Sequence, residues 1–323
     1  MSRRALLISA ALAALAAALP ARAQDWPSRP VKVIFPYQPG GGGDIIARLV
    51  LDRVSRKLGQ QFVVESRSGA GGIIGADSVA KASPDGYTLV VSGMGSHVIA
   101  PIILKAPFDP MKDFTHIALF GGPPLVLAVN PGFEAKTLQQ YVELSRAAPQ
   151  GIVYGSPGPG THANLIGEMF RKLSGAGLVH VPYKGSGPSA ADLVAGHIPS
   201  AIMTLGSAAG FVRSGRLRLL AVTATGRVAD FPDVPTFAEA GYKDIVAITW
   251  FALSGPAGLP RSVALRLNAE VRAALAEPDI RKRLLADGIE PGDLDADAFT
   301  EFFRAEIDRW APLARTAKTT AAK

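Results

Sequence analysis

Hydrophobic residues follow two alternating patterns along the first third of the chain. Short runs rich in β-branched and aromatic residues, typical of buried strands, alternate with segments whose apolar residues recur at helical spacing. The predicted elements are a strand at 31–35, a helix at 45–58, a strand at 62–65, a helix at 76–82 and a strand at 87–91. This alternation predicts a parallel sheet that binds ligands at the carboxyl ends of its strands.

The same layout begins again after a continuous apolar strand at 125–129. The elements predicted after it are a helix at 138–148, a strand at 152–154, a helix at 163–173, a strand at 179–183, a helix at 189–195 and strands at 200–203 and 217–223. The two segments share a layout without repeating a sequence. They therefore predict an α/β protein with two lobes that face each other.

The tail after Pro256 is mainly helical, with helices predicted at 262–276, 278–287 and 296–314. Such helices need a sheet to cover, and the first lobe lacks helices on one side, so we place the tail back on the first lobe. The chain would then cross between the lobes near Val126 and again near Trp250. The predicted divisions are a leader at 1–23, the first lobe at 24–125, the second lobe at 126–249 and a return to the first lobe at 250–323.

A glycine-rich turn leads into a helix in each predicted lobe, at Pro39–Asp44 and at Gly155–His162. A helix start exposes free backbone N–H groups, and its dipole favours an anion. Glycines also remove the side chains that would keep a ligand from the backbone. If the two turns face each other across a cleft, they can hold one anion between them. The alternative is two independent structural turns. A third small-residue loop is predicted at Ser92–His97.

Three residues at these helix starts admit more than one role each. Asp44 would repel a bare anion beside it, so it caps free N–H groups, contacts the ligand through water, or accepts a ligand N–H or O–H group. Thr161 is a helix cap or a ligand donor. His162 is a packed histidine or a ligand contact, and packed histidines are the more common.

Tyr37 and Tyr183 could line a pocket with an apolar face and a hydroxyl group, or could be core tyrosines whose hydroxyls are satisfied. Lys184 beside a glycine turn is either a solvated charge or an anion contact. The five histidines have no metal-binding spacing, so we predict no metal site and no cofactor.

Composition narrows the class of protein. Residues 1–23 have the basic, apolar and small-residue regions of a signal peptide, with cleavage expected after Ala23, which predicts a periplasmic protein. Ser2-Arg3-Arg4 resembles a twin-arginine signal, a second export route.

Removing this signal peptide leaves 31 basic and 27 acidic residues, which are dispersed along the chain, so nucleic acid is not a predicted partner. With no cysteine, thiol catalysis and disulfides are excluded.

Enzyme motifs are absent from the sequence. The glycine run lacks the lysine of a P-loop, and no serine has the G-x-S-x-G frame. An exported hydrolase with the same cleft would need a nucleophile and a base, which the sequence does not pair. We therefore predict a binding protein rather than an enzyme.

Many short motifs, taken in order, resemble the periplasmic solute-binding receptors of tripartite tricarboxylate transporters, the Bug-type receptors. The resemblance covers the whole chain after the leader. Its motifs are Trp26-Pro27-Ser28-Arg29-Pro30, Pro39-Gly40-Gly41-Gly42-Gly43-Asp44, Gly69-Ala70-Gly71-Gly72, Pro84-Asp85-Gly86-Tyr87-Thr88, Phe108-Asp109-Pro110, Ser156-Pro157-Gly158-Pro159-Gly160-Thr161-His162, Val181-Pro182-Tyr183-Lys184-Gly185, Asp233-Val234-Pro235-Thr236 and Pro256-Ala257-Gly258-Leu259-Pro260. Gly43 departs from the pattern, since many relatives have threonine there.

This resemblance implies the type II periplasmic binding fold, in which two α/β lobes close on a ligand in the cleft at the hinge. It implies a small carboxylate ligand, either a di- or tricarboxylate or an aromatic acid, that a monomeric receptor delivers to membrane permease subunits. A sensory receptor for two-component signalling would share this binding chemistry. The glycine turns of the two lobes would hold the carboxylate like pincers, partly through water. The expected ligand-binding residues are Tyr37, Gly40, Gly41, Asp44, Ser92, Gly93, Ser156, Gly158, Gly160, Thr161, His162, Tyr183, Lys184 and Gly185.

Overall fold

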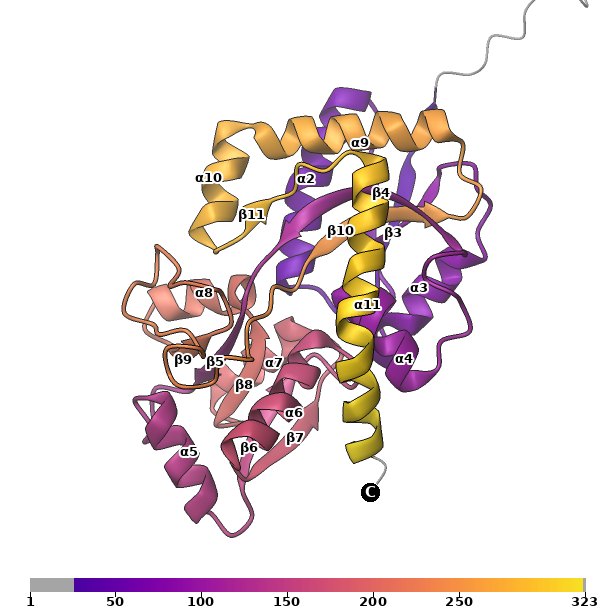
Figure 1. The fold of residues 1–323 in the computed structure, drawn as a ribbon. Helices are drawn as coiled ribbons and strands as arrows, with labels where there is room; N and C mark the ends of the chain where they lie inside the picture. The colour runs from indigo at the N-terminus through magenta and orange to yellow at the C-terminus, as the bar shows by residue number, and fades with distance from the viewer. Residues whose placement is uncertain (1–25, 322–323) are drawn as a thin grey trace, which may run out of the picture.

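The computed structural model describes residues 26–321. The predicted leader, its cleavage site and the twin-arginine motif lie outside the described residues. The rest of the chain forms two α/β lobes, each built around its own sheet, as the sequence predicts (Figure 1). None of the helices described within residues 26–321 is long and apolar enough to cross a membrane.

The first lobe contains a six-stranded sheet of order β11-β4-β10-β3-β1-β2. Its strands are β1 (Val31–Phe35), β2 (Phe62–Ser66), β3 (Thr88–Gly93), β4 (Phe114–Gly122), β10 (Phe251–Pro256) and β11 (Glu290–Pro291). β1 pairs with β2 and β3 in parallel, as predicted. β10, which the sequence does not predict, returns from the second lobe and lies antiparallel between β3 and β4, so the complete sheet is mixed.

Helices cover both faces of this sheet. They are α2 (Gly42–Leu58), α3 (Ile73–Ala80), α4 (Ala100–Leu104), α9 (Arg261–Ala276), α10 (Pro278–Ala286) and α11 (Ala296–Ala321), with helical turns η1 (Ala70–Gly72) and η2 (Met94–Ile99). α2 buries Ile46, Val50 and Val54, spaced four residues apart, against the sheet and ends at Gly59, whose φ of 69° suits a residue without Cβ. The expected loop at Ser92–His97 is instead the end of β3 followed by the π-helical η2.

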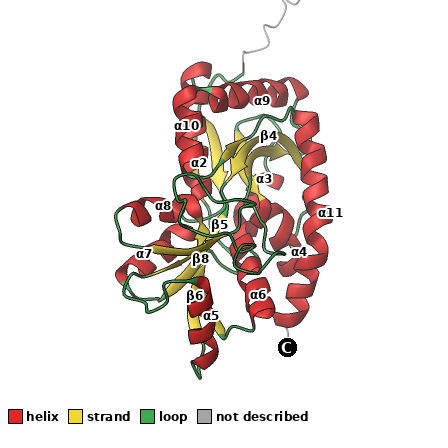
Figure 2. Ribbon diagram, turned by 60° about the vertical axis from the view of Figure 1, so that its left-hand side comes forward, coloured by secondary structure: helices red, strands yellow, loops and turns green. Residues whose placement is uncertain are grey.

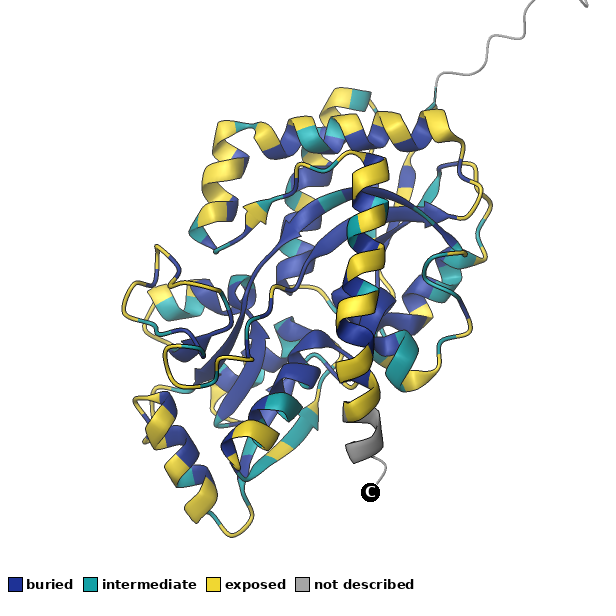
Figure 3. Ribbon diagram, in the orientation of Figure 1, coloured by how far each residue is buried: buried dark blue, intermediate teal, exposed yellow. Residues whose placement is uncertain are grey.

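The second lobe contains a five-stranded sheet of order β7-β6-β8-β5-β9. Its elements are β5 (Leu125–Val129), α5 (Leu138–Ala147), β6 (Ile152–Ser156), α6 (His162–Ser174), β7 (Leu178–Pro182), α7 (Ser186–Ala195), β8 (Ser200–Thr204), α8 (Leu205–Arg213) and β9 (Arg218–Val222). β6, β7 and β8 are parallel, so α6, α7 and α8 all begin at the same edge of the sheet. Figure 3 shows that the strands of both lobes are mostly buried while the helices expose their outer faces.

The C-terminal helices return to the first lobe. α9 packs on α2 and β4, whereas α11 packs on β4, η2 and α4 and also contacts α6 of the second lobe. Figure 2 shows α11 running along the side of the molecule past both sheets. The tail therefore covers the first lobe and also connects it to the second.

The chain passes between the lobes twice, at Pro123-Pro124 and at Thr249-Trp250, and the two crossings lie against each other. The backbone N–H of Thr249 donates to the carbonyl of Pro123 at 3.0 Å. A Cβ at Gly122 would come within 2.6 Å of the Thr249 carbonyl oxygen and the Trp250 Cα. Only glycine allows the two segments to approach this closely.

We expect Gly122→Ala to destabilise the fold by about 1–3 kcal/mol, because the added methyl group must push the two crossings apart. Gly210→Ala is the matched control, since Gly210 is exposed on α8 and an added Cβ there meets no atom within 4 Å. That substitution should stabilise by about 0.5–1 kcal/mol. Urea denaturation of the three proteins measures both effects. Equal stabilities for the two variants would contradict this account of the crossings.

Candidate ligand-binding site

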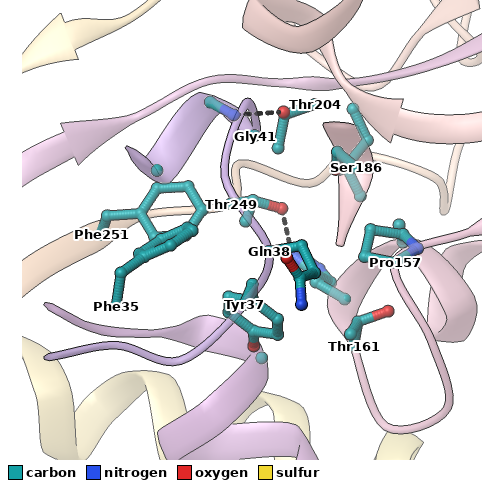
Figure 4. Close-up of a pocket in the computed structure, with 16 residues that line it drawn as sticks. Phe35, Tyr37, Gln38, Gly41, Pro157, Thr161, Ser186, Thr204, Thr249 and Phe251 are labelled. Carbon is teal, nitrogen blue, oxygen red and sulfur yellow. Dashed lines mark hydrogen bonds between the residues drawn. The ribbon is translucent and has the colours of Figure 1, made fainter. Parts of the chain in front are cut away.

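A cavity of about 40 Å³ lies at the seam between the lobes (Figure 4). The first lobe contributes Tyr37 and the start of α2, and the second lobe contributes the starts of α6, α7 and α8. The cavity therefore sits where four helices begin, at the carboxyl ends of the strands that precede them. The two glycine turns predicted to face each other both lie on its wall.

The acidic residue of the first turn, Asp44, is bound by donors from the same turn and helix. Asp44 is 5% exposed, and its carboxylate accepts the N–H of Gly40 at 3.1 Å and the Arg48 guanidinium at 2.7 Å. This arrangement favours the capping role among those considered for Asp44, because both carboxylate oxygens face protein donors. The Gly40 N–H is occupied by this hydrogen bond, and Gly40 does not line the cavity.

The first turn is also tied to the second lobe. The N–H of Gly42 donates to the hydroxyls of Thr204 and Ser207, each at 3.1 Å. The N–H of Gln38 donates to the carbonyl of Lys184 at 2.8 Å. These bonds join the lobes directly across the seam, so the structure is a closed form of the cleft.

The second turn uses most of its side-chain groups to fix its own shape. The Ser156 hydroxyl accepts the N–H of Gly158 at 3.1 Å and lies 2.6 Å from His180 Nε2. The Thr161 hydroxyl donates to the Gly158 carbonyl and accepts the N–H of Asn164, which makes Thr161 the N-cap of α6. Thr161 still lines the cavity, whereas Ser156 and Gly158 do not.

At the starts of α2 and α6, four wall residues have backbone N–H groups with no acceptor among the described residues. They are Gly41 and Gly43 at the start of α2 and His162 and Ala163 at the start of α6. An added Cβ at Gly43 would come within 2.4 Å of the Phe251 ring, so this ring occupies the space that a side chain at position 43 would need. The two helix starts thus offer free donors and partial positive charge to the same small space.

His162 is buried and neutral. Its Nδ1 lies 2.8 Å from the Thr249 hydroxyl, its ring meets that of Trp310 edge-on at 4.4 Å, and its Nε2 has no partner among the described residues. Burial lowers the pKa of His162 to about 3, so the ring brings no charge to the cavity at neutral pH.

Two more of the predicted residues lie within the seam. The Tyr37 ring lines the cavity while its hydroxyl donates to the Gly71 carbonyl at 3.1 Å, and burial raises the pKa of this hydroxyl well above its usual value. Gly185 is buried near Gln38, so it packs at the lobe contact.

The remaining predicted residues stand outside the cavity wall. Gly93 ends β3, and the Ser92 hydroxyl bonds that of Ser254 at 2.7 Å inside the first sheet. The Tyr183 hydroxyl donates to Asp192, and the Lys184 side chain is exposed. Gly160 donates its N–H towards the Asn164 side chain at 3.4 Å.

Several wall residues do not figure in the sequence prediction. They are Phe35, Gln38, Leu125, Ala163, Ser186, Thr204, Thr249 and Phe251. Ser186 and Thr204 each stand at a strand-to-helix turn, a signal that the sequence contained. Thr249 and Phe251 reach the cavity only because β10 inserts between β3 and β4, which local sequence does not reveal.

No group of three or more histidine or acidic residues that could hold a metal occurs within residues 26–321.

These features define a two-lobe binding protein with an anion-binding cleft. The model of the tripartite tricarboxylate transporter family receptor matches residues 46–318. Protein BugT of Bordetella pertussis is 34% identical over 98% of this chain and 97% of its own length. The chain belongs to the tripartite tricarboxylate transporter receptor family, whose members are periplasmic receptors rather than enzymes.

Solved structures agree with this assignment. An R. palustris protein solved with adipate is 33% identical, with a TM-score of 0.87 over 91% of this chain and 98% of that chain. MatC from Rhodopseudomonas palustris with bound malate is 30% identical, with a TM-score of 0.85 over 90% of this chain and all of that chain. The predicted family and fold are therefore confirmed.

The neutral state of His162 predicts a pH dependence of stability. An unfolded histidine binds a proton near pH 6.5, whereas the folded pKa is about 3, so the unfolded state gains protons first as the pH falls. The stabilisation is present above pH 6.5 and is lost as the pH falls towards 3. At pH 5 the loss should be about 2 kcal/mol relative to pH 7.

We expect His162→Asn, which keeps a hydrogen-bonding side chain but does not titrate, to reduce the pH dependence of unfolding by about that amount. Chemical denaturation of both proteins at pH 7 and pH 5 gives the comparison. Because His97 and His116 also have pKa values lowered by burial, to about 3 and about 4, part of the pH dependence should remain in the variant. An identical pH dependence in the two proteins would contradict a neutral, buried His162.

Proposed function

We propose that this protein captures a small carboxylate-bearing solute in the periplasm and delivers it to the permease subunits of a tripartite transporter. The observation that carries the proposal is the set of four unpaired N–H groups at two helix starts that face one cavity. Backbone N–H groups and helix dipoles attract an anion without any charged side chain. The ligands of the two solved relatives, adipate and malate, are carboxylates as well.

Closure of the lobes would couple binding to delivery. The bonds from Gly42 to Thr204 and from Gln38 to Lys184 exist only when the lobes are together. A ligand that contacts both helix starts binds the closed form better and shifts the population towards it. The permease would then distinguish the closed, loaded receptor from the open one.

The geometry of the site favours ligand binding without a catalysed reaction. Within the described residues, the serine–histidine pairs nearest to the site are Ser96 with His97 and Ser156 with His180. Ser96 is 1% exposed and does not line the cavity. Ser156 is fully buried and points away from the cavity wall, so a substrate in the cavity cannot reach its hydroxyl. We further propose that the protein is exported with cleavage after Ala23 and acts as a monomer.

A thermal-shift screen tests the ligand class. Di- and tricarboxylates, aromatic acids, amino acids and nicotinate should be compared with neutral amides of the same acids. A ligand at a hundredfold excess over its Kd should stabilise the protein by about 2.7 kcal/mol. Failure of every carboxylate on ligand-free protein would refute the anion-binding cleft.

Gly41→Val should abolish carboxylate binding and leave the fold intact. The Gly41 backbone has φ −78° and ψ 160°, which valine adopts freely, and the nearest atom to an added Cβ is Ser186 Cβ at 3.8 Å. The valine methyl groups would therefore enter the cavity and not the core. Gly226→Val is the control, because Gly226 is exposed and its Cβ would meet nothing. Calorimetric titration that finds unchanged affinity in Gly41→Val would refute the role of this turn.

A further inference from the structure

We propose that the ligand of this receptor carries a single carboxylate on an apolar body, as aromatic and longer aliphatic monocarboxylic acids do. This inference rests on the proposed function and narrows it. It is drawn from the distribution of charged groups, of unpaired hydrogen-bonding groups and of apolar surface around the cavity.

Charge is missing from the cavity wall. Among the described residues that line it, none is lysine, arginine, aspartate or glutamate, and His162 is neutral. The nearest acid along the chain, Asp44, is satisfied by Gly40 and Arg48, and the Lys184 side chain is exposed outside the wall. The attraction for an anion comes from the helix starts alone, which suits one carboxylate.

The helix starts carry polar groups that have no hydrogen-bond partner among the described residues. The hydroxyls of Thr161, Thr204 and Thr249 are already bonded within the protein. The Ser186 hydroxyl has no partner among the described residues, and Ser186 Cβ lies 3.8 Å from where a Cβ on Gly41 would stand. Its hydroxyl therefore adds to the donors of the same end of the cavity.

The other side of the cavity is aromatic. Figure 4 shows Phe35 and Phe251 together, on the side away from Pro157 and Thr161. Phe35 is 2% exposed and meets the Tyr37 ring edge-on at 5.7 Å. The Phe251 ring is seated over Gly43, where a larger residue would displace it.

A second carboxylate on this aromatic side would lose its hydration without gaining a charged side-chain partner among the described residues, which is strongly unfavourable. An apolar body would instead gain contact with three rings. The cavity thus pairs one anion-binding end with one apolar end. In this respect the expected ligand differs from the adipate and malate of the solved relatives, which carry two carboxylates each.

Calorimetric titration of the whole mature protein with matched acids tests the inference. The pairs are benzoate with terephthalate and hexanoate with adipate, and the neutral controls are benzamide and hexanamide. We expect the monoacid to bind at least tenfold more tightly than its diacid in one or both pairs, and the amides not to bind. A diacid that binds as tightly as its monoacid, or more tightly, in both pairs overturns the inference and leaves the proposed function standing. Amides that bind as well as the acids, or no binding by any acid in the broader carboxylate screen, would refute the proposed function itself.

A charge introduced into the wall provides the second test. Gln38 lines the cavity at its partly exposed edge, so Gln38→Arg adds a cation without disturbing the core. The ratio of diacid to monoacid affinity should rise at least tenfold. Gln139→Arg adds the same charge on the exposed face of α5 and should leave the ratio unchanged. Melting temperatures confirm that both variants fold, and an unchanged ratio in Gln38→Arg would contradict control of ligand choice by charge.

Discussion

The convergence of helix N-termini on one seam is the constraint on which the rest of this structure depends. α2, α6, α7 and α8 all begin at the cavity, and none of the described residues on its wall is lysine or arginine. Partial charges at helix ends act only within about the first turn, so the starts must be held close together. The mixed sheet of the first lobe, the parallel core of the second and the close crossing at Gly122 all serve to hold them there.

The two lobes are connected by more than the two crossing segments. Trp250, at the second crossing, donates its indole N–H to Glu306 of α11 at 2.9 Å. Four residues further along α11, Trp310 packs against His162 at the start of α6, and His162 in turn bonds Thr249. The C-terminal helix, the crossing and one of the helix starts at the cavity therefore form a single packed unit, so a movement of α6 must be accommodated by α11.

Local sequence was sufficient for most of the elements and for the two glycine turns. The strands at 31–35 and 125–129 were predicted with the boundaries found, because their apolar runs are bounded by polar and turn residues. β4, β10 and α8 were missed, and with them Thr204, Thr249 and Phe251 of the cavity wall. β10 pairs with strands that lie more than a hundred residues away in the chain, and such pairing leaves no periodic signal. The roles of the Ser156 and Thr161 hydroxyls likewise depend on bonds that only the folded turn defines.

The use of backbone groups as the anion donors has a consequence for how such a receptor can diversify. A substitution on the wall exchanges a side chain but leaves the N–H groups of the helix starts in place, provided that no Cβ enters the space between them. The surface that meets the body of the ligand can then vary at Phe35, Leu125 and Phe251 while the attachment point stays constant. One scaffold can thus acquire new ligands through changes at a few apolar positions, without having to rebuild an anion site each time.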